Sequence, residues 1–498
     1  MINNSDQYAL KAFNQIPRIL SNMDRNEFSK TYGCLHRDYW LYKTSDFSDA
    51  VRQFSSQALA LVYDNNFIEN IYYKNKKVGE WAKASLLYWC KIQHKDGSFD
   101  EFYPNERGWV GPTAFTAFSS AESFKILQPL FNKDEKILVK NALLKSAYFI
   151  GKGESEEDHL ANHHAMACLA VWKIYKLFND EKLLVIYNRL WKGFITYCDI
   201  KEGWAREYDG IDPGYLSATV SFLGKIYEDN GDQEILEICK KFINTCSYFV
   251  YPNGFYAGTT GSRNTLHLYT HGFEIFSKES DISAAIADKM LLSIKENKLV
   301  TPEIMSDRYV GYRIPEYLQS YLSYKKREKI NSQIPCELPY LTKYFKNAGI
   351  WIYGNENVYV ISNLAKGGAL KIFNKKSRVL LYDDAGLLVE TNDGNIISSQ
   401  WIDSEYKLNI SENSYSVSGN LNVVPSNKYF NVIKLIVFRT FLLFFGWNSF
   451  FAHKIKGTIR KILMLGNRRS PMSFKRELKI ENQSITITNS VKKNKSLR

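Results

Sequence analysis

The sequence predicts a multidomain chain in which a helical domain is followed by an antiparallel β domain. Three observations support this fold class. Apolar residues recur at three- and four-residue spacing through the first 330 residues, glycine-bearing turns repeat within that region, and short alternating runs begin beyond about residue 340. At 498 residues the chain is too long for one ordinary core. We therefore expect two domains, at residues 1–330 and 331–498.

The helical pattern divides into ten amphipathic segments with a period close to 3.6 residues. These segments are residues 51–64, 79–93, 112–127, 136–149, 161–178, 181–198, 214–228, 233–249, 282–296 and 309–324.

Glycine-bearing turns occur at regular distances between these segments. Gly97, Gly151, Gly203 and Gly254 are separated by 54, 52 and 51 residues. One helical hairpin with its loops has this length, and a regular period of this size is typical of repeat architectures. We expect an incomplete (α/α)5-6 toroid, built from five or six hairpins.

The C-terminal region consists of short runs that suit an antiparallel sheet. Residues 351–354, 358–362, 378–382 and 484–488 are rich in β-branched and aromatic residues, and Gly, Asn and Asp turns separate them. These runs predict a β-sandwich. Residues 325–339 are the expected linker, because Pro335 and Pro339 interrupt the helical period there.

Cysteine usage and the N-terminus indicate a cytoplasmic protein. The seven cysteines form no CxxC pair, and most lie in apolar helical surroundings, which is a pattern of reduced thiols. The first residues lack the basic and then apolar regions of a signal peptide.

The positive charge is concentrated near the C-terminus. Residues 451–498 carry thirteen Lys or Arg against two Glu, which accounts for most of the net charge of +13. We interpret them as a basic tail that follows an aromatic segment, residues 435–447. Arg439 interrupts this segment, whose apolar length falls short of the roughly 20 residues of a spanning helix. It could lie on an anionic membrane surface or form a buried element of the β domain. No nucleic-acid partner is expected, since no recognition motif is present.

Residues that follow the repeated turns are expected to meet at one rim of the toroid, because equivalent turns of stacked hairpins lie on the same side. Six of the eight histidines lie between positions 94 and 271, mostly in these segments. Amide, imidazole and phenol groups could remove and deliver a proton beside a bound carboxylate. The rim candidates are Asp100, Glu101, Tyr103, His159, Asn162, His163, His164, Arg206, Glu207, Tyr208, Tyr215, Tyr256, Arg263, Asn264, His267 and His271.

Several of these segments resemble the heparinase II/III-like family. This group combines an α/α-toroid with a β-sandwich, and it includes polysaccharide lyases and members of surface-polysaccharide gene clusters. The similar segments are TYGCLHRDYW at 31–40, DGSFDEFYP at 96–104, Asn162-His163, Glu207-Tyr208, PGY at 213–215, and GSRN at 261–264 with His271-Gly272. The resemblance covers about residues 30–330.

The resemblance implies β-elimination on a glycan that contains uronic acid. Asn162, His163 and Arg263 would neutralise the carboxylate. Tyr215 would transfer the proton, with Tyr208 as second choice and His271 as partner. A tyrosine acts as a base near neutral pH only if nearby cations lower its pKa from about 10. The implied substrate-binding residues are Arg37, Tyr39, Trp40, Asp100, Glu101, Tyr103, Arg206, Glu207, Asn264 and His267.

Other functions fit parts of the same pattern. A carboxylate pair drawn from Asp100, Glu101, Asp209 and Asp212 would suit a glycoside hydrolase on a toroid. The pairs His159/His163 and His267/His271 could share helix faces as metal ligands, but neither has an evident third ligand. We therefore expect no metal and no cofactor. A non-catalytic glycan-binding or assembly factor is the remaining alternative.

Overall fold

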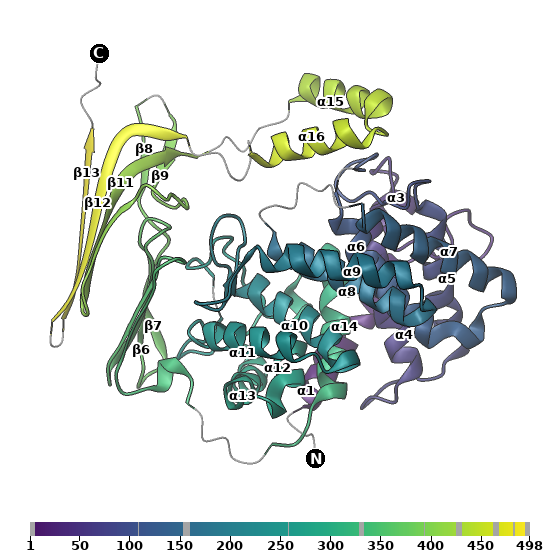
Figure 1. Cartoon of the computed structure of the whole chain (residues 1–498), viewed down its shortest axis with the longest axis horizontal. Coiled ribbons are helices and arrows are strands. Elements are labelled where there is room, and N and C mark those ends of the chain that lie inside the picture. The colour runs from purple at the N-terminus through teal and green to yellow at the C-terminus, as the bar shows by residue number, and fades with distance from the viewer. Residues whose placement is uncertain are drawn as a thin grey trace.

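The computed structural model describes residues 5–107, 109–152, 160–256, 258–327, 333–392, 394–424, 431–461, 468–481 and 484–493. It contains a helical domain, two stacked β-sheets and a separate helical hairpin near the C-terminus (Figure 1).

All ten predicted helices are present. The matching elements are η1 (Ala50–Ser55) with α4 (Ser56–Asp64), α5 (Lys76–Ile92), α6 (Gly111–Leu127), α7 (Lys133–Ile150), α8 (Ala161–Phe178), α9 (Glu181–Ile195), α10 (Pro213–Asn230), α11 (Gln233–Ser247), α13 (Asp281–Lys295) and α14 (Asp307–Ser323). The domain also contains α1 (Asp6–Phe13), α2 (Ile16–Asn22), α3 (Arg37–Trp40), α12 (His271–Ile275) and a two-residue hairpin of β1 (Cys198–Asp199) with β2 (Trp204–Ala205).

The helices form a toroid, as predicted. The inner helices α4, α6, α8, α10, α12 and α14 contact one another in chain order, and α14 returns to contact α4. The helix α1 supplies the outer partner of α14, and the Tyr8 hydroxyl donates to Glu274 Oε1 at 2.8 Å. One hairpin is incomplete, because its inner helix α12 has only five residues.

The repeated glycines have a packing role. Gly97, Gly203 and Gly254 adopt φ values of 96°, 79° and 81°, which favour glycine. A Cβ on Gly97 would lie 2.3 Å from the Lys145 carbonyl oxygen of α7, and one on Gly203 would lie 2.6 Å from that of Lys241 in α11. Each turn therefore packs closely on the outer helix of the following hairpin, which explains the regular interval.

The β domain contains two antiparallel sheets. The first has the order β3-β4-β5-β6-β7. Its strands are β3 (Leu341–Phe345), β4 (Ile350–Gly354), β5 (Val358–Asn363), β6 (Ala369–Asn374) and β7 (Val379–Asp384). The second has the order β13-β12-β11-β9-β8, with β10 paired to β11. Its strands are β8 (Leu388–Glu390), β9 (Ile396–Ser398), β10 (Lys407–Ile410), β11 (Ser414–Val423), β12 (Arg469–Glu481) and β13 (Ser484–Lys493).

The central strands of the first sheet, β4, β5 and β6, are buried on both faces. Trp351 and Val360 point toward the second sheet and share its core, while Ile352 and Tyr359 belong to the core of the helical domain. Neighbouring residues on one strand point to opposite faces, so a sheet that is covered on both sides is apolar at successive positions. The predicted sandwich is present, and its first sheet also joins the toroid.

The expected aromatic segment and basic tail have defined secondary structure. Residues 435–447 lie mostly in α15 (Val432–Phe445), which is followed by α16 (Ser449–Arg460). The region 451–498 is not a tail, because it continues into β12 and β13. Arg476 on β12 is fully buried and bonds to Asp384 Oδ2 at 2.8 Å. None of the described helices has the length and apolar character needed to cross a bilayer.

Candidate functional site

The first turns of four inner helices, α6, α8, α10 and α14, surround a cavity of about 120 Å³. It is lined by Val51, Glu101, Phe102, Trp109, Gly111, Pro112, Phe115, Asn162, His163, Tyr208, Tyr215, His267, Tyr269, Tyr309 and Tyr312. The structure thus brings together six of the predicted site residues, namely Glu101, Asn162, His163, Tyr208, Tyr215 and His267.

Asn162 is held at the start of α8 by Glu207. The side-chain nitrogen of Asn162 donates to both carboxylate oxygens of Glu207 at 2.9 Å, and the Asn162 backbone N–H donates to Glu207 Oε1 at 2.6 Å. Both side chains are buried. A carboxylate accepts but does not donate, so the amide oxygen of Asn162 faces away from Glu207.

His163 lies among aromatic rings. It stacks on Trp109 with ring centroids 5.5 Å apart and meets Phe115 edge to face at 5.4 Å. Gly111, the first residue of α6, approaches the imidazole so closely that a Cβ there would lie 2.7 Å from His163 Nδ1. The imidazole can therefore lie where it does only because residue 111 has no side chain.

Tyr208 occupies a strained turn. Glu207 and Gly210 exchange two backbone hydrogen bonds, and between them Tyr208 and Asp209 have φ values of 50° and 68°. Two-residue turns of this kind favour Asn-Gly, because a side chain at positive φ is disfavoured. Strained residues of this kind are frequent at functional sites. The Arg263 guanidinium lies 4.4 Å from the centroid of the Tyr208 ring.

Tyr215 and His267 are two further residues of the cavity lining. Tyr215 is in the first turn of α10, where Asp212 caps the helix by accepting from its N–H at 3.2 Å. Burial, followed by Tyr208 and the carboxylates of Asp212 and Glu207, raises the pKa of Tyr215 well above 10. Burial and then Arg313 lower the pKa of His267 to about 3. At neutral pH the site therefore contains a protonated phenol beside an uncharged imidazole, with ring centroids 6.4 Å apart.

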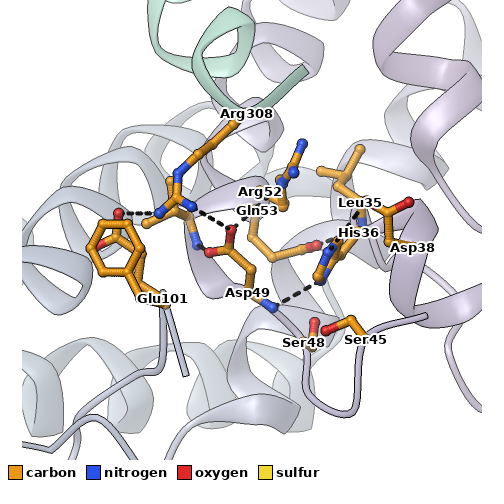
Figure 2. A network of polar contacts seen from close by, with 12 residues as sticks. Leu35, His36, Asp38, Ser45, Ser48, Asp49, Arg52, Gln53, Glu101 and Arg308 are labelled. Atoms are coloured by element: carbon orange, nitrogen blue, oxygen red, sulfur yellow. Dashed lines mark hydrogen bonds and ion pairs between the residues drawn. The ribbon is translucent and has the colours of Figure 1, made fainter. Parts of the chain in front are cut away.

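A network of buried charges lies on the Glu101 side of the cavity (Figure 2). Arg308 of α14 lies between the carboxylates of Glu101 and Asp49. Its guanidinium is 2.5 Å from Glu101 Oε1 and 4.0 Å from Asp49 Oδ2. Burial outweighs this cation and raises the pKa of Glu101 to about 8 and that of Asp49 to about 6. His36 Nδ1 accepts from the Asp49 N–H at 3.0 Å, and burial lowers the pKa of its imidazole to about 4.

Lys456 of α16 contributes a further charge. Its ammonium lies 3.3 Å from the centroid of the Trp109 ring and 2.5 Å from Glu106 Oε1. The other oxygen of Glu106 accepts from the N–H groups of Glu101 and Phe102 at 3.1 and 2.7 Å. The C-terminal hairpin is thus connected to residues that line the cavity.

Two predicted residues, Arg263 and Asn264, lie nearby, outside the cavity lining. Arg263 contacts Tyr208, as described, and the Asn264 side-chain oxygen accepts from Lys366 Nζ at 2.5 Å. Lys366 belongs to the loop after β5 and also donates to the carbonyls of Thr259 and Gly261. This lysine from the β domain therefore holds the loop that carries Arg263.

The remaining predicted residues do not line the cavity. Arg37, Tyr39 and Trp40 form α3, where the Trp40 indole donates to the Asn22 carbonyl at 2.8 Å. Asp100 accepts from the Glu106 N–H and contacts His94, both at 2.8 Å. The Tyr103 ring packs on Phe438, the Arg206 guanidinium lies over the Tyr197 ring, and the His271 imidazole is hydrogen-bonded to Ser323. His159 lies outside the described residues.

Several residues that line the cavity are not among the predicted ones. Tyr309 and Tyr312 belong to the first turns of α14, which is equivalent to α8 and α10, but no glycine turn at the repeat interval precedes it. Trp109 follows the Gly97 turn and precedes α6, so its place after a repeat turn could have identified it. Within the described ranges, no three His, Cys, Asp or Glu side chains form a group that could hold a metal ion.

Comparisons with known proteins agree with this architecture. Residues 67–272 match the family described as the ulvan lyase N-terminal domain. No curated protein gives a significant match.

Two solved lyase structures share the fold. Chondroitin AC lyase from Streptomyces coelicolor A3, in complex with chondroitin sulphate, is 8% identical with a TM-score of 0.55, over 84% of this chain and 67% of the lyase. Xanthan lyase from Paenibacillus is 8% identical with a TM-score of 0.51, over 85% of this chain. The present chain covers only 45% of that xanthan lyase. Residues 67–272 are therefore similar to a polysaccharide lyase domain, and the chain shares the overall fold of these two lyases.

Proposed function

We propose that this polysaccharide lyase-like protein cleaves a uronic-acid-containing glycan by β-elimination. The observation that carries the proposal is the cavity in which Asn162, His163, Tyr208 and Tyr215 converge. This set offers an amide, an imidazole and two phenols around a space at the toroid rim, which are the groups that removal of a C5 proton requires.

Several features favour an anionic sugar ring. The first turns of α6, α8, α10 and α14 face the cavity, and helix N-termini carry partial positive charge. His163 and Arg263 would donate to the sugar carboxylate as the enolate develops. Asn162, whose nitrogen already donates to Glu207, would accept from a sugar hydroxyl through its amide oxygen.

The two phenols suit different proton transfers. Arg263 lies over Tyr208, where a cation favours the anionic form of a phenol, so Tyr208 would take the C5 proton. Tyr215, held protonated by its raised pKa, would give its proton to O4 as the C4–O4 bond breaks. The electrons of the C5–H bond form the C4=C5 double bond. The other product carries a new hydroxyl group, and solvent returns the proton from Tyr208 to Tyr215.

A hydrolase receives less support from the carboxylates. Among Asp100, Glu101, Asp209 and Asp212, only Glu101 lines the cavity. Asp212 accepts from the N–H groups of Tyr215 and Arg263, so it holds the start of α10 and its neighbouring loop. Asp100 is likewise bonded within its own loop. Hydrolysis requires two carboxyl groups on either side of the scissile bond.

The cellular role is part of the same proposal. The resemblance to members of surface-polysaccharide gene clusters suggests a substrate made during surface-polysaccharide biosynthesis. All seven cysteines are free thiols, which fits a cytoplasmic location.

The test is incubation of the purified chain with ulvan, chondroitin sulphate and xanthan, followed by two product assays. A lyase produces an unsaturated uronate that absorbs in the ultraviolet together with a new reducing end. Reducing ends without that absorbance would identify a hydrolase. Binding to a glycan without either product would favour the non-catalytic alternative.

A further inference from the structure

We infer that the hairpin of α15 and α16 docks this protein on the surface of an anionic lipid bilayer. This interaction surface is separate from the cavity and does not depend on the proposed reaction. Figure 1 shows the hairpin beyond the rim of the toroid, apart from both sheets.

The outer side of the hairpin is strongly apolar. Ile433, Val437, Leu443, Phe444, Trp447 and Phe450 are each at least 59% exposed. Such a concentration of large exposed side chains on two adjacent helices differs from the scattered apolar residues of an ordinary surface. Trp and Phe are also the side chains that enter the boundary between headgroups and acyl chains.

The charge of the hairpin identifies the kind of surface that it fits. Residues 431–461 include six Lys or Arg and no Asp or Glu. A segment that combines exposed aromatic groups with basic residues and no acidic ones is complementary to anionic headgroups. Each Lys or Arg that does not pair with the toroid adds to this attraction. A second copy of the chain would instead bring an equally basic hairpin against this one.

The inner side of the hairpin is attached to the toroid, which gives the outer side a fixed direction. Phe438 meets the Tyr103 ring at 5.2 Å, and Arg439 pairs with Asp46 at 3.2 Å. The only charged residue near the middle of α15 therefore faces protein. With 14 residues, α15 is about 21 Å long. A hydrocarbon core is about 30 Å thick, so this helix would lie along the surface.

The hairpin also contacts residues that line the cavity. Lys456 of α16 contacts the rings of Trp109 and Phe102, both of which line the cavity. Docking through the outer side of the hairpin would therefore hold the cavity near the lipid surface. A glycan attached to a membrane lipid would reach it there.

Sedimentation of the full-length chain with vesicles tests the inference. One vesicle preparation contains phosphatidylcholine alone, and the other contains phosphatidylcholine with phosphatidylglycerol. We expect binding to the anionic vesicles that weakens as salt is raised, and little binding to the neutral ones. The double variant Phe444→Ser/Trp447→Ser should reduce the bound fraction by roughly tenfold or more, since it removes buried apolar area.

Matched variants make the result specific. Leu388→Ser removes an apolar side chain of β8 that is 70% exposed, and it should bind like the unmodified chain. Lys454→Glu on α16 should weaken binding to anionic vesicles, whereas Lys192→Glu on α9 should not. Equal binding to neutral vesicles, or unchanged binding by the double variant, would overturn the inference. A dimer in solution that Phe444→Ser/Trp447→Ser dissociates would also overturn it, by showing that a second copy covers the hairpin.

Discussion

Asn162 and Glu207 form one hydrogen-bonded unit, since both carboxylate oxygens of Glu207 lie 2.9 Å from the amide nitrogen of Asn162. The two residues lie 45 positions apart, Asn162 at the start of α8 and Glu207 after the end of α9. An antiparallel bridge between Leu160 and Glu207 brings them together. The orientation of the Asn162 amide is thus set by an acidic residue that does not line the cavity.

Glu207→Gln should therefore lower activity through Asn162. The new amide has only one acceptor oxygen, and its NH2 group would face that of Asn162. We expect kcat/KM to fall about 100-fold, as expected for a small misplacement of a reacting group. Loss of charge-assisted bonds should cost about 1.5–3 kcal/mol of unfolding free energy. Steady-state kinetics and thermal melts measure both effects. Glu181→Gln, at an exposed position of α9, is the control, and equal activity of both variants would contradict the prediction.

The phenols can be separated by substitution. Tyr208→Phe and Tyr215→Phe should each reduce kcat by about 100- to 10,000-fold, because each removes one proton-transfer group. Both variants should retain their circular dichroism spectra. Tyr309→Phe, which alters a partly exposed phenol of the same cavity, should retain most activity. Full turnover by Tyr215→Phe would exclude it as the proton donor.

Gly111→Ala tests the position of the His163 ring. The added Cβ would lie 2.7 Å from Nδ1, so the imidazole must move. We expect a loss of about 10- to 100-fold in kcat/KM, since a shift near 1 Å is sufficient. Gly193→Ala on α9 is the matched control, because a Cβ there meets nothing within 4 Å. That control should keep its activity and gain about 0.5–1 kcal/mol of stability. Activity of Gly111→Ala equal to that of the control would show that the ring position is unimportant.

Glu101 should make stability depend on pH. Its folded-state pKa is about 8, above its ordinary value of 4.5, so the folded chain binds a proton that the unfolded chain releases between these values. Stability should therefore fall as pH rises from about 4.5 to about 8. Glu101→Gln cannot ionise and should flatten this slope in urea unfolding curves at several pH values. An unchanged slope would mean that Glu101 is ionised throughout.

Lys366 should couple the β domain to the site. Its ammonium donates to the carbonyls of Thr259 and Gly261 and to the side chain of Asn264, at 3.1, 2.6 and 2.5 Å. Lys366→Met leaves these buried acceptors without this donor, at a cost of about 1–3 kcal/mol. The loop that carries Arg263 should then become more sensitive to protease, and kcat/KM should fall. Lys376→Met, on the exposed turn after β6, is the control.

The toroid was largely predictable from the sequence. The glycine turns recur because each packs on the next outer helix, so the packing requirement appears directly as a sequence interval. The same regularity indicated that Asn162, His163, Tyr208 and Tyr215 would meet at one rim. Tyr309 and Tyr312 were missed because α14 is preceded by a 3-10 turn, Pro302–Ile304, without glycine.

Other features lie beyond what periodicity can indicate. His271 follows the same rule as the other rim residues, but it begins the five-residue helix α12, and its imidazole contacts Ser323 outside the cavity lining. Residues 435–447 are apolar on nearly every side, so their pattern does not identify the face of α15 that contacts protein. The buried Arg476 side chain bonds to Asp384 and to the Gly368 carbonyl. These partners belong to a strand and a turn that are distant in the sequence, so the local pattern around Arg476 does not indicate them.

The packing of α1 on α14 has a consequence for synthesis. The Tyr8 hydroxyl bonds to Glu274, which is synthesised 266 residues later. The helix on which α1 packs, α14, ends only at Ser323. A chain growing from the ribosome therefore keeps the apolar face of α1 without its final partner until residue 323 has been made. We expect this interval to be the period in which the nascent chain most needs a chaperone.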